Sequence, residues 1–222
     1  MTDADFAFVD GAGLDTAAAY RLIVGCVVPR PVAWITTVDR QGRVNAAPFS
    51  SYNYVATSPP MLAVNIAARA GDGAIKDTAR NILDSGEFVV NVATEATLEA
   101  MHASAFEYPP EEGEAAALGL ELLPSRHVRA PRLAATPVQM ECRFDQAVTL
   151  GRGVNTLYIG EVVAFHLSHA VYDGSRVDSA AMRPVARLGG PFYAALGEII
   201  HRPMLQRPPG GEGWQGTAPP KS

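Results

Sequence analysis

RPVAWITTVDRQGRVNAAPFSSYN, residues 30–53, consists of two apolar runs separated by the polar break at residues 39–42. Two runs of strand composition joined by a few residues that include Gly predict a β-hairpin. The first run, Val32–Val38, is apolar on both faces, which is typical of a strand in a closed barrel or a covered sheet. The second run ends in small polar residues such as Ser50 and Ser51, which could meet a ligand at the end of the strand.

Further strands are predicted along the rest of the chain, with helices between some of them. The strand patterns lie at Met61–Ala67, Glu87–Ala93, Val138–Leu150, Thr156–Leu167 and, as a last short strand, Val171–Asp178. Gly151–Asn155 is a turn that can close the hairpin between the two longest strands. The predicted helices are Thr16–Val24 with Asp15 as N-cap, a segment capped by Asp77 or Thr78 and ended by Gly86, a segment from Thr94 to about Phe106, a short one near Ala115–Leu118, and Tyr193–Ile200. Six or seven strands with two or three inserted helices indicate a mainly β, antiparallel barrel.

Length and composition indicate one domain and restrict its partners. The chain has 222 residues, enough for one large β domain. Charged residues make up 18%, below the usual level of about 25%, which suggests that part of the surface is buried against a second copy of the chain. The net charge is −5 and no basic run is present, which argues against a nucleic-acid binder.

Compartment and domain limits are also expected from the sequence. Cys26 and Cys142 form no C-x-x-C pair, which favours a reducing compartment. The start of the chain has no secretory signal pattern, and no apolar stretch is long enough to span a bilayer, so we expect a cytoplasmic protein. We expect residues 1–14 to form an N-terminal arm, residues 15–201 to form the domain, and the Pro- and Gly-rich residues 202–222 to form a flexible tail.

Lys76-Asp77-Thr78 is the strongest local signal for a binding site. It follows a loop with Gly71 and Gly73 and begins an amphipathic segment. A helix N-terminus with a Lys and a hydroxyl suits a phosphate, because free amides and the helix dipole favour an anion. A plain helix start with a solvated Lys has the same pattern. The Walker loop and the G-x-G-x-x-G fingerprint are both missing, which argues against a nucleoside triphosphatase and a Rossmann domain.

Trp34 and the segment Arg187–Tyr193 each allow two interpretations. Trp34 is either a core residue of the first strand or a platform for a stacked ring. The segment Arg187–Tyr193 is either a tight turn or a flap over a bound ring. Ser50 and Ser51 do not lie in G-x-S-x-G, so hydrogen bonding to a ligand is favoured over nucleophilic catalysis.

Histidine spacing gives little support for a metal site. His166 with His169, and Glu198 with His201, are the tempting pairs. The first pair follows a strand, where residues three apart point to opposite faces. The second is half of a di-iron motif without its second copy. We therefore expect no metal site.

Taken in order, these segments resemble the flavin reductase-like family of FMN-binding split barrels, and in particular its flavoredoxin-like branch. The resemblance covers most of residues 20–200. The residues that carry it are RPVAWITT at 30–37, NAAPFSSY at 45–52, SPP at 58–60, KDT at 76–78 with Asn81 and Ile82, EFVVN at 87–91, and Arg187–Tyr193. The chain departs from the short reductases that serve two-component oxygenases, which have other residues in place of RPVAWITT and lack the stretch Tyr108–Pro137.

The resemblance implies a homodimer of antiparallel six-stranded Greek-key split β-barrels with inserted helices, each site holding FMN near the subunit interface. By the same resemblance, Val32–Thr37 and Ser50–Tyr52 would line the flavin ring and ribityl chain, Lys76–Thr78 would take the phosphate, and Arg69 would add a cation. The residues expected to bind the cofactor are Arg30, Pro31, Val32, Ala33, Trp34, Thr36, Asn45, Pro48, Ser50, Ser51, Tyr52, Arg69, Lys76, Asp77, Thr78, Arg187 and Tyr193.

The activity implied is NAD(P)H-dependent FMN reduction. NADH or NADPH would pass hydride to FMN, and the electrons would go on to a partner oxygenase or another acceptor. No catalytic side chain is required, because the cofactor supplies the chemistry. Two alternatives stay open: an FMN-binding electron-transfer protein without efficient NAD(P)H oxidation, and a barrel without flavin that serves as an interaction module.

Overall fold

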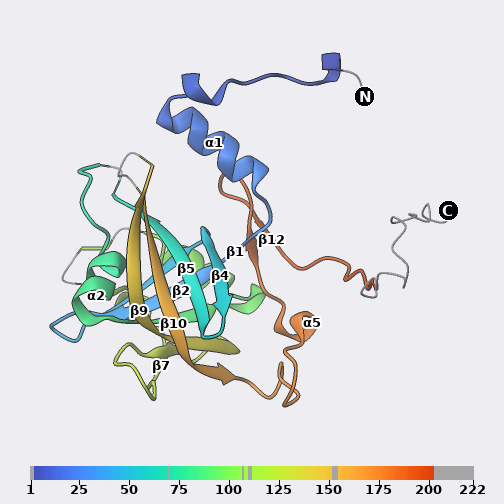
Figure 1. The fold of residues 1–222 in the computed structure, drawn as a ribbon. Coiled ribbons are helices and arrows are strands. Elements are labelled where there is room, and N and C mark those ends of the chain that lie inside the picture. The colour runs from blue at the N-terminus through green and yellow to red at the C-terminus, as the bar shows by residue number, and fades with distance from the viewer. Residues whose placement is uncertain (1–2, 70, 107, 110–111, 152–154, 203–222) are drawn as a thin grey trace.

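The computed structural model describes residues 3–69, 71–106, 108–109, 112–151 and 155–202 (Figure 1). Except for Arg202, the predicted tail lies outside the described residues, as does the middle of the predicted turn at Gly151–Asn155. No helix in the described chain combines the length and the apolar character that crossing a membrane requires.

The main element is an antiparallel sheet of seven strands, which confirms the predicted mainly β split barrel. Its strand order is β3-β2-β6-β9-β10-β5-β4. The strands are β2 (Ala33–Val38), β3 (Val44–Phe49), β4 (Tyr52–Thr57), β5 (Pro60–Ala67), β6 (Glu87–Val92), β9 (Val138–Leu150) and β10 (Asn155–Leu167). The sheet has one strand more than the six expected, because residues 44–57 bend at Ser50-Ser51 and form both β3 and β4.

The Ser50-Ser51 corner explains why this sheet curls. It joins β3 to β4, and these strands occupy the two opposite edges of the sheet. A connection of two residues can link opposite edges only if the sheet bends until its edges meet. At the corner, the Asn65 N–H donates to the Ser51 carbonyl over 2.8 Å.

The predicted hairpin at residues 30–53 is confirmed. β2 and β3 pair from Val38 opposite Val44 to Ala33 opposite Phe49, and Gly42 in the turn has φ +84°, which favours glycine. Both faces of β2 are covered, as predicted. Ile35 belongs to the core cluster inside the barrel, whereas Trp34 packs in a second cluster with Met101 and Leu133.

Shorter elements surround the barrel. The helices are α1 (Thr16–Cys26), α2 (Asp77–Ser85), α3 (Leu98–Ala103), α4 (Glu114–Ala117) and α5 (Ser179–Met182), with 3-10 turns η1 (Asp3–Asp5), η2 (Gly11–Gly13) and η3 (Glu95–Thr97). The short strands are β1 (Arg30–Pro31), β7 (Leu122–Leu123), β8 (Arg132–Leu133), β11 (Ala186–Arg187) and β12 (Tyr193–Ala194).

Two predicted elements are wrong. The helix expected at Tyr193–Ile200 is absent, because Tyr193 and Ala194 pair with β11 as strand β12 and residues 195–200 have no regular structure. The strand expected at Val171–Asp178 is reduced to one isolated bridge between Tyr172 and Val177. The caps predicted at Asp15 and Gly86 are present.

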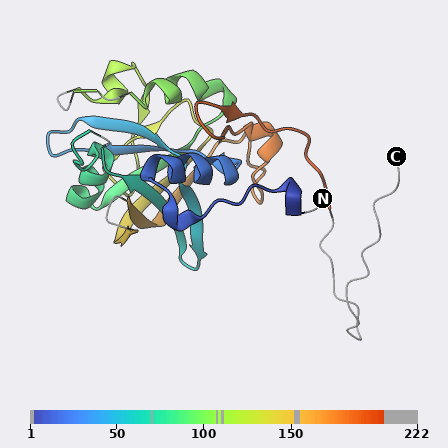
Figure 2. The same ribbon diagram turned by 90° about the horizontal axis from the view of Figure 1, so that it is seen from above.

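Helix α1 lies beyond the end of the barrel, next to the small sheet of β1, β11 and β12 (Figures 1 and 2). None of its residues is buried. The Arg30 side chain holds the end of this helix, since Nη1 donates to the carbonyls of Val24 and Val27 at 2.6 Å each. Its Nη2 donates to the Leu188 carbonyl at 2.9 Å, so one guanidinium joins α1 to the β11–β12 loop.

Candidate functional site

Two adjoining cavities form the candidate site, and Pro48, Lys76 and Ala105 line both of them. We call them the helix end, about 140 Å³, and the flap end, about 330 Å³. The helix end is lined by Asn45, Ala47, Pro48, Phe49, Arg69, Lys76, Asp77, Thr78, Ser104, Ala105, Phe106, Tyr108 and Glu114. The flap end is lined by Tyr20, Val24, Arg30, Val32, Pro48, Ser50, Ser51, Lys76, Ala105, Arg187, Leu188, Gly190 and Tyr193.

The first turn of α2 faces the helix end with free donors. Lys76 is the N-cap and makes no side-chain capping bond. Within the described ranges, the backbone N–H groups of Asp77, Thr78 and Ala79 have no acceptor, and the Lys76 ammonium has no partner. Three free amides and an unpaired cation at a helix N-terminus form a site suited to an anion.

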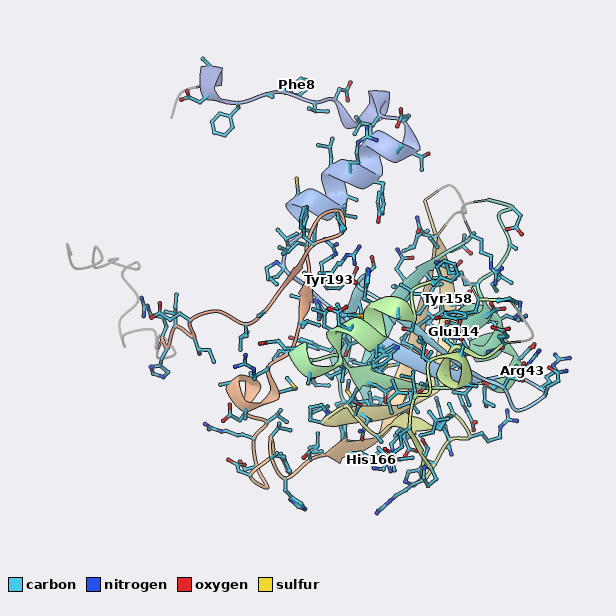
Figure 3. The ribbon with its side chains drawn as sticks, turned by 180° about the vertical axis from the view of Figure 1, so that it is seen from behind. Phe8, Arg43, Glu114, Tyr158, His166 and Tyr193 are labelled. Atoms are coloured by element: carbon cyan, nitrogen blue, oxygen red, sulfur yellow. The ribbon has the colours of Figure 1, made fainter. Side chains whose placement is uncertain are left out.

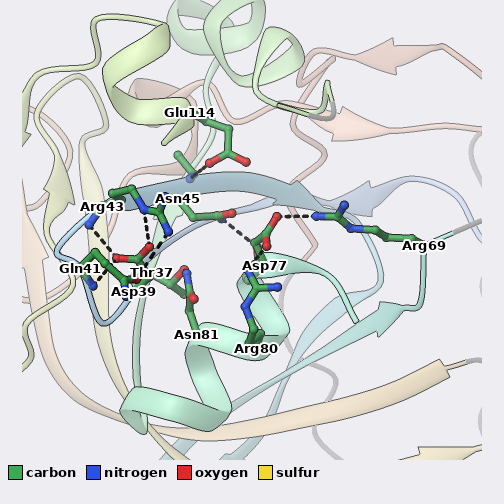
Figure 4. Close-up of polar contacts among 12 residues, drawn as sticks. Thr37, Asp39, Gln41, Arg43, Asn45, Arg69, Asp77, Arg80, Asn81 and Glu114 are labelled. Atoms are coloured by element: carbon green, nitrogen blue, oxygen red, sulfur yellow. Dashed lines mark hydrogen bonds and ion pairs between the residues drawn. The ribbon is translucent and has the colours of Figure 1, made fainter. Parts of the chain in front are cut away.

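The predicted cap by Asp77 or Thr78 is wrong, because both side chains have other partners. Asp77 forms ion pairs with Arg69, at 2.5 Å, and with Arg80 (Figure 4). The Thr78 hydroxyl is hydrogen-bonded to the Asn45 side-chain amide at 2.9 Å. The Asp77 carboxylate therefore holds two arginines at the edge of the site and leaves the helix amides free.

Glu114, the first residue of α4, reaches the helix end from the opposite side (Figures 3 and 4). Its Oε2 accepts from the Ala46 N–H at 3.2 Å. Gly113 makes this approach possible, because a Cβ there would lie 2.6 Å from the Val44 carbonyl oxygen. Burial raises the pKa of the Glu114 carboxyl above its ordinary value, and the charge of Asp77 raises it further.

At the flap end, Arg187 and Tyr193 contact each other and neighbouring residues. Arg187 Nη2 donates to the Gly190 carbonyl at 2.8 Å, and the guanidinium lies 4.5 Å from the centre of the Tyr193 ring. The Tyr193 hydroxyl lies 3.2 Å from Nδ1 of His102 on α3. The segment predicted as a turn or a flap is thus a β11–β12 turn whose side chains line a cavity.

The structure brings most of the predicted cofactor residues together. The helix end collects Asn45, Pro48, Arg69, Lys76, Asp77 and Thr78, and the flap end collects Arg30, Val32, Pro48, Ser50, Ser51, Lys76, Arg187 and Tyr193.

Five predicted cofactor residues do not line either cavity. Ala33, Trp34 and Thr36 are buried in β2, and Thr36 Oγ1 donates to the Pro131 carbonyl at 2.5 Å. Pro31 is exposed in β1, and Tyr52 packs against the barrel core. Of the two interpretations of Trp34, the geometry favours the core residue.

Neither Glu114 nor the lining residues Ser104–Phe106 were predicted from the sequence. The stretch around Glu114 reads as a polar connector, and only the folded chain places it over β3. Concerning metals, no three His, Cys, Asp or Glu side chains come together in the described part of the chain, and His166 is bonded to Glu141 at 2.5 Å.

Comparison with known proteins identifies the family. The model of the flavin reductase like domain matches residues 24–181. This chain belongs to the flavin reductase-like family. The match contains the α2 N-terminus and the Ser50-Ser51 corner, and it leaves out Tyr20 and the segment of β11, β12 and their turn, which line the flap end. The predicted family is confirmed.

Several known proteins are similar to this chain along most of their length. An uncharacterized protein of Halalkalibacterium halodurans is 39% identical over 194 residues, which are 85% of this chain and 92% of that protein. Nitrilotriacetate monooxygenase component B of Bacillus cereus is 33% identical, with a TM-score of 0.84 over 89% of this chain and 98% of that one. The 2-nitrobenzoate 2-nitroreductase of Pseudomonas fluorescens is 29% identical, with a TM-score of 0.82 over 95% and 100%. The flavoredoxin of Desulfovibrio vulgaris shares the fold, with a TM-score of 0.69 and 23% identity over 88% and 97%.

Proposed function

We propose that this protein binds FMN and uses NADH or NADPH to reduce it, passing the electrons on to an acceptor. The observation that carries the proposal is the uncapped N-terminus of α2: Lys76, Asp77 and Thr78 line a cavity, and, within the chain the structure describes, Lys76 is unpaired and the first amides of the helix have no acceptor. Such a set of donors suits a phosphate group. A flavin mononucleotide carries one phosphate at the end of its ribityl chain, which matches a site with one anion-binding end.

The two ends of the site would bind different parts of the cofactor. The α2 amides and Lys76 would hold the phosphate, with Arg69 kept nearby by Asp77. The flap end, with Val32, Ser50 and the Arg187–Tyr193 pair, would hold the ring. FMN, when bound, would supply the hydride and electron chemistry.

Reconstitution tests the cofactor. The purified protein, incubated with FMN and passed through a desalting column, should keep one flavin per chain with a perturbed visible spectrum. A protein that releases all flavin on the column and leaves the spectrum of free FMN unchanged would refute the proposal. The interaction module without flavin would then be the remaining alternative.

The Lys76→Ala variant tests the placement of the phosphate. Loss of a charged hydrogen bond should weaken FMN about 10- to 100-fold and leave riboflavin nearly unaffected. Arg40→Ala is a matched control, because it removes another cation that is 75% exposed and paired with Asp84. Fluorescence titration gives both dissociation constants. Equal weakening of FMN and riboflavin would place the phosphate elsewhere.

The electron donor is tested separately from the cofactor. Anaerobic mixing with NADH or NADPH in a stopped-flow instrument should bleach the bound flavin faster than free FMN. If neither nucleotide does so, the protein is an FMN-binding electron carrier instead. Component B of nitrilotriacetate monooxygenase, at 33% identity, supports an oxygenase as the acceptor.

We also propose that the protein works as a homodimer. Tyr20, Ile23 and Val28, in and after α1, are large apolar residues with exposed side chains, and α1 buries no residue in the single chain. Tyr54 and Val55 on the edge strand β4 are exposed as well. Exposed apolar surface of this kind indicates a partner. Sedimentation equilibrium should give about twice the chain mass of 23.5 kDa, and a monomer at micromolar concentration would contradict this.

A further inference from the structure

A buried polar chain joins α4 to the first turn of α2. Glu114, Asn45 and Thr78 are 9%, 7% and 1% exposed. One end of the Asn45 amide lies 2.9 Å from Thr78 Oγ1, and the other end lies 3.2 Å from Glu114 Oε1. Figure 4 shows Asn45 between Glu114 and the start of α2. Any change at Glu114 therefore reaches the proposed phosphate site through one amide group.

The orientation of this amide depends on the proton of Glu114. A neutral Glu114 can donate to Asn45 Oδ1, while Asn45 Nδ2 donates to Thr78 Oγ1. An ionised Glu114 has no proton to donate and requires the reversed amide, with Nδ2 toward the carboxylate. Asn45 Oδ1 then accepts hydrogen bonds from the Thr78 hydroxyl at 2.9 Å and from the Ala46 N–H at 3.2 Å.

The two states differ in what they offer to an anion at the start of α2. With Glu114 neutral, the Thr78 hydroxyl keeps its proton free to donate into the cavity that Thr78 lines. With Glu114 ionised, that proton is used by Asn45, and a negative carboxylate shares the cavity with the anion. Like charges at close range oppose each other in a low-dielectric site. An anionic phosphate should therefore bind better to the state with neutral Glu114.

We propose that Glu114 is a specificity-determining residue that binds a proton together with the phosphate of a phosphorylated flavin, with Asn45 relaying its protonation state to Thr78. This inference rests on the proposed FMN site. It assigns a role to the inserted segment 108–137, which supplies Glu114. It also predicts that discrimination between FMN and riboflavin depends on pH.

The other charged groups around Glu114 are paired with each other or stand apart from it. On the α2 side, Asp77 is paired with Arg69 and Arg80. Lys76 is the cation without a partner among the described residues that line this cavity. Burial of the carboxyl and the charge of Asp77 raise the Glu114 pKa, whereas Arg69 acts in the opposite direction.

Four more titratable groups lie near Glu114, two from the β2–β3 hairpin and two from the segment that contains Glu114. In the cavity adjoining Glu114, Asp39 and Arg43 form an ion pair of 2.6 Å. Tyr108 and Glu112 line the same cavity. Glu112 is exposed, so it serves as a control for a carboxylate on the same segment that is in contact with solvent.

The test compares FMN and riboflavin between pH 5.5 and 8.5 on the wild type and the Glu114→Gln variant. In the wild type, the ratio of the FMN to the riboflavin dissociation constant should rise with pH relative to the variant, by up to about tenfold per pH unit for one coupled proton. Gln keeps the shape and can donate to Asn45 Oδ1 at every pH. The comparison also removes the phosphate's own ionisation near pH 6, with a pKa of about 6. Glu112→Gln should behave like the wild type.

Calorimetry of the wild type gives a second readout that needs no variant. Titration at pH 8 in buffers of different ionisation enthalpy should show proton uptake with FMN and none with riboflavin. At that pH the free phosphate is already a dianion, since its second pKa is about 6. If FMN binds without proton uptake, or if the wild type and Glu114→Gln give parallel pH profiles, the role of Glu114 is refuted and the FMN site stands. If neither flavin binds at any pH, the proposed function itself fails.

Discussion

Glu114 and Glu141 are both buried carboxyl groups, yet their surroundings are opposite. Glu141 on β9 accepts from the backbone N–H groups of Arg126 and His127 at 2.7 and 2.6 Å and lies 2.5 Å from His166 Nε2. Glu114 accepts one backbone bond, at 3.2 Å. One carboxylate has its oxygens satisfied by three donors, and the other has a single long bond and an amide that can turn.

This difference sets the direction of each pKa. Burial raises the pKa of Glu141, but the N–H groups of Arg126 and His127 and the His166 side chain outweigh it and hold the pKa below its ordinary value. Burial raises the pKa of Glu114, and the backbone donors of Ala46 and of Glu114 itself do not offset it. The donors around each buried carboxyl thus decide whether its pKa is lowered or raised.

The largest effect on stability is expected at Glu141. Glu141→Gln removes the charge and puts an NH₂ group against N–H donors, which should lower the free energy of unfolding by about 3 kcal/mol. Because the folded pKa of Glu141 is lowered, its contribution is present above the ordinary value of 4.5 and is lost as pH falls through the folded pKa. Urea denaturation at pH 7 and below pH 4.5 measures both. Glu161→Gln, at an exposed position on β10, is the control.

An intermediate effect is expected where α4 contacts β3. Gly113→Ala would place Cβ 2.6 Å from the Val44 carbonyl oxygen, so α4 must move away and carry Glu114 with it. Overpacking of this kind costs about 1–3 kcal/mol. Gly197→Ala has no atom within 4 Å of its Cβ and should leave the midpoint unchanged. Thermal unfolding of the two variants measures the difference, and equal midpoints would show that α4 does not depend on this contact.

The smallest effect, of opposite sign to that at Glu141, is expected at Glu114. Its folded pKa is raised, so its contribution is present below the ordinary value of 4.5 and is lost as pH rises through the folded pKa. Glu114→Gln should therefore match the wild type at acidic pH and gain stability relative to it at neutral pH, by less than about 1 kcal/mol. Urea midpoints from pH 4 to 8 measure the crossover. A Glu114→Gln variant that loses stability relative to the wild type as pH rises would contradict the raised pKa of Glu114.

Residues 30–53 show how much of the fold could be predicted. Their apolar runs and the Gly42 turn are local features, so the hairpin and its two covered faces followed from the pattern. The helix predicted after Tyr193 failed because pairing with β11 outweighed the local preference of the segment. The bend at Ser50-Ser51 was not predicted either, because it joins two strands that lie at opposite edges of the sheet.

In the candidate site, too, some features could be predicted from the sequence and others could not. Lys76-Asp77-Thr78 was predictable, because a cation and a helix start occupy neighbouring positions in the chain. The pairing of Asp77 with Arg69, which leaves the helix amides free, could not be predicted. Asp has a high propensity for the N-cap position, so the sequence pattern favours a cap there.

The sequence by itself determined the barrel class, the hairpin and the helix start at Lys76-Asp77-Thr78, because each depends on residues close together in the chain. Only the tertiary structure decided that Glu114 lies beside Asn45 and Thr78, which are 69 and 36 residues away in sequence. It likewise decided that Trp34 faces the core and not the groove. The physical reason is that the burial and the donors of a carboxyl or a ring depend on neighbours supplied by other segments, and these neighbours come together only when the sheet closes.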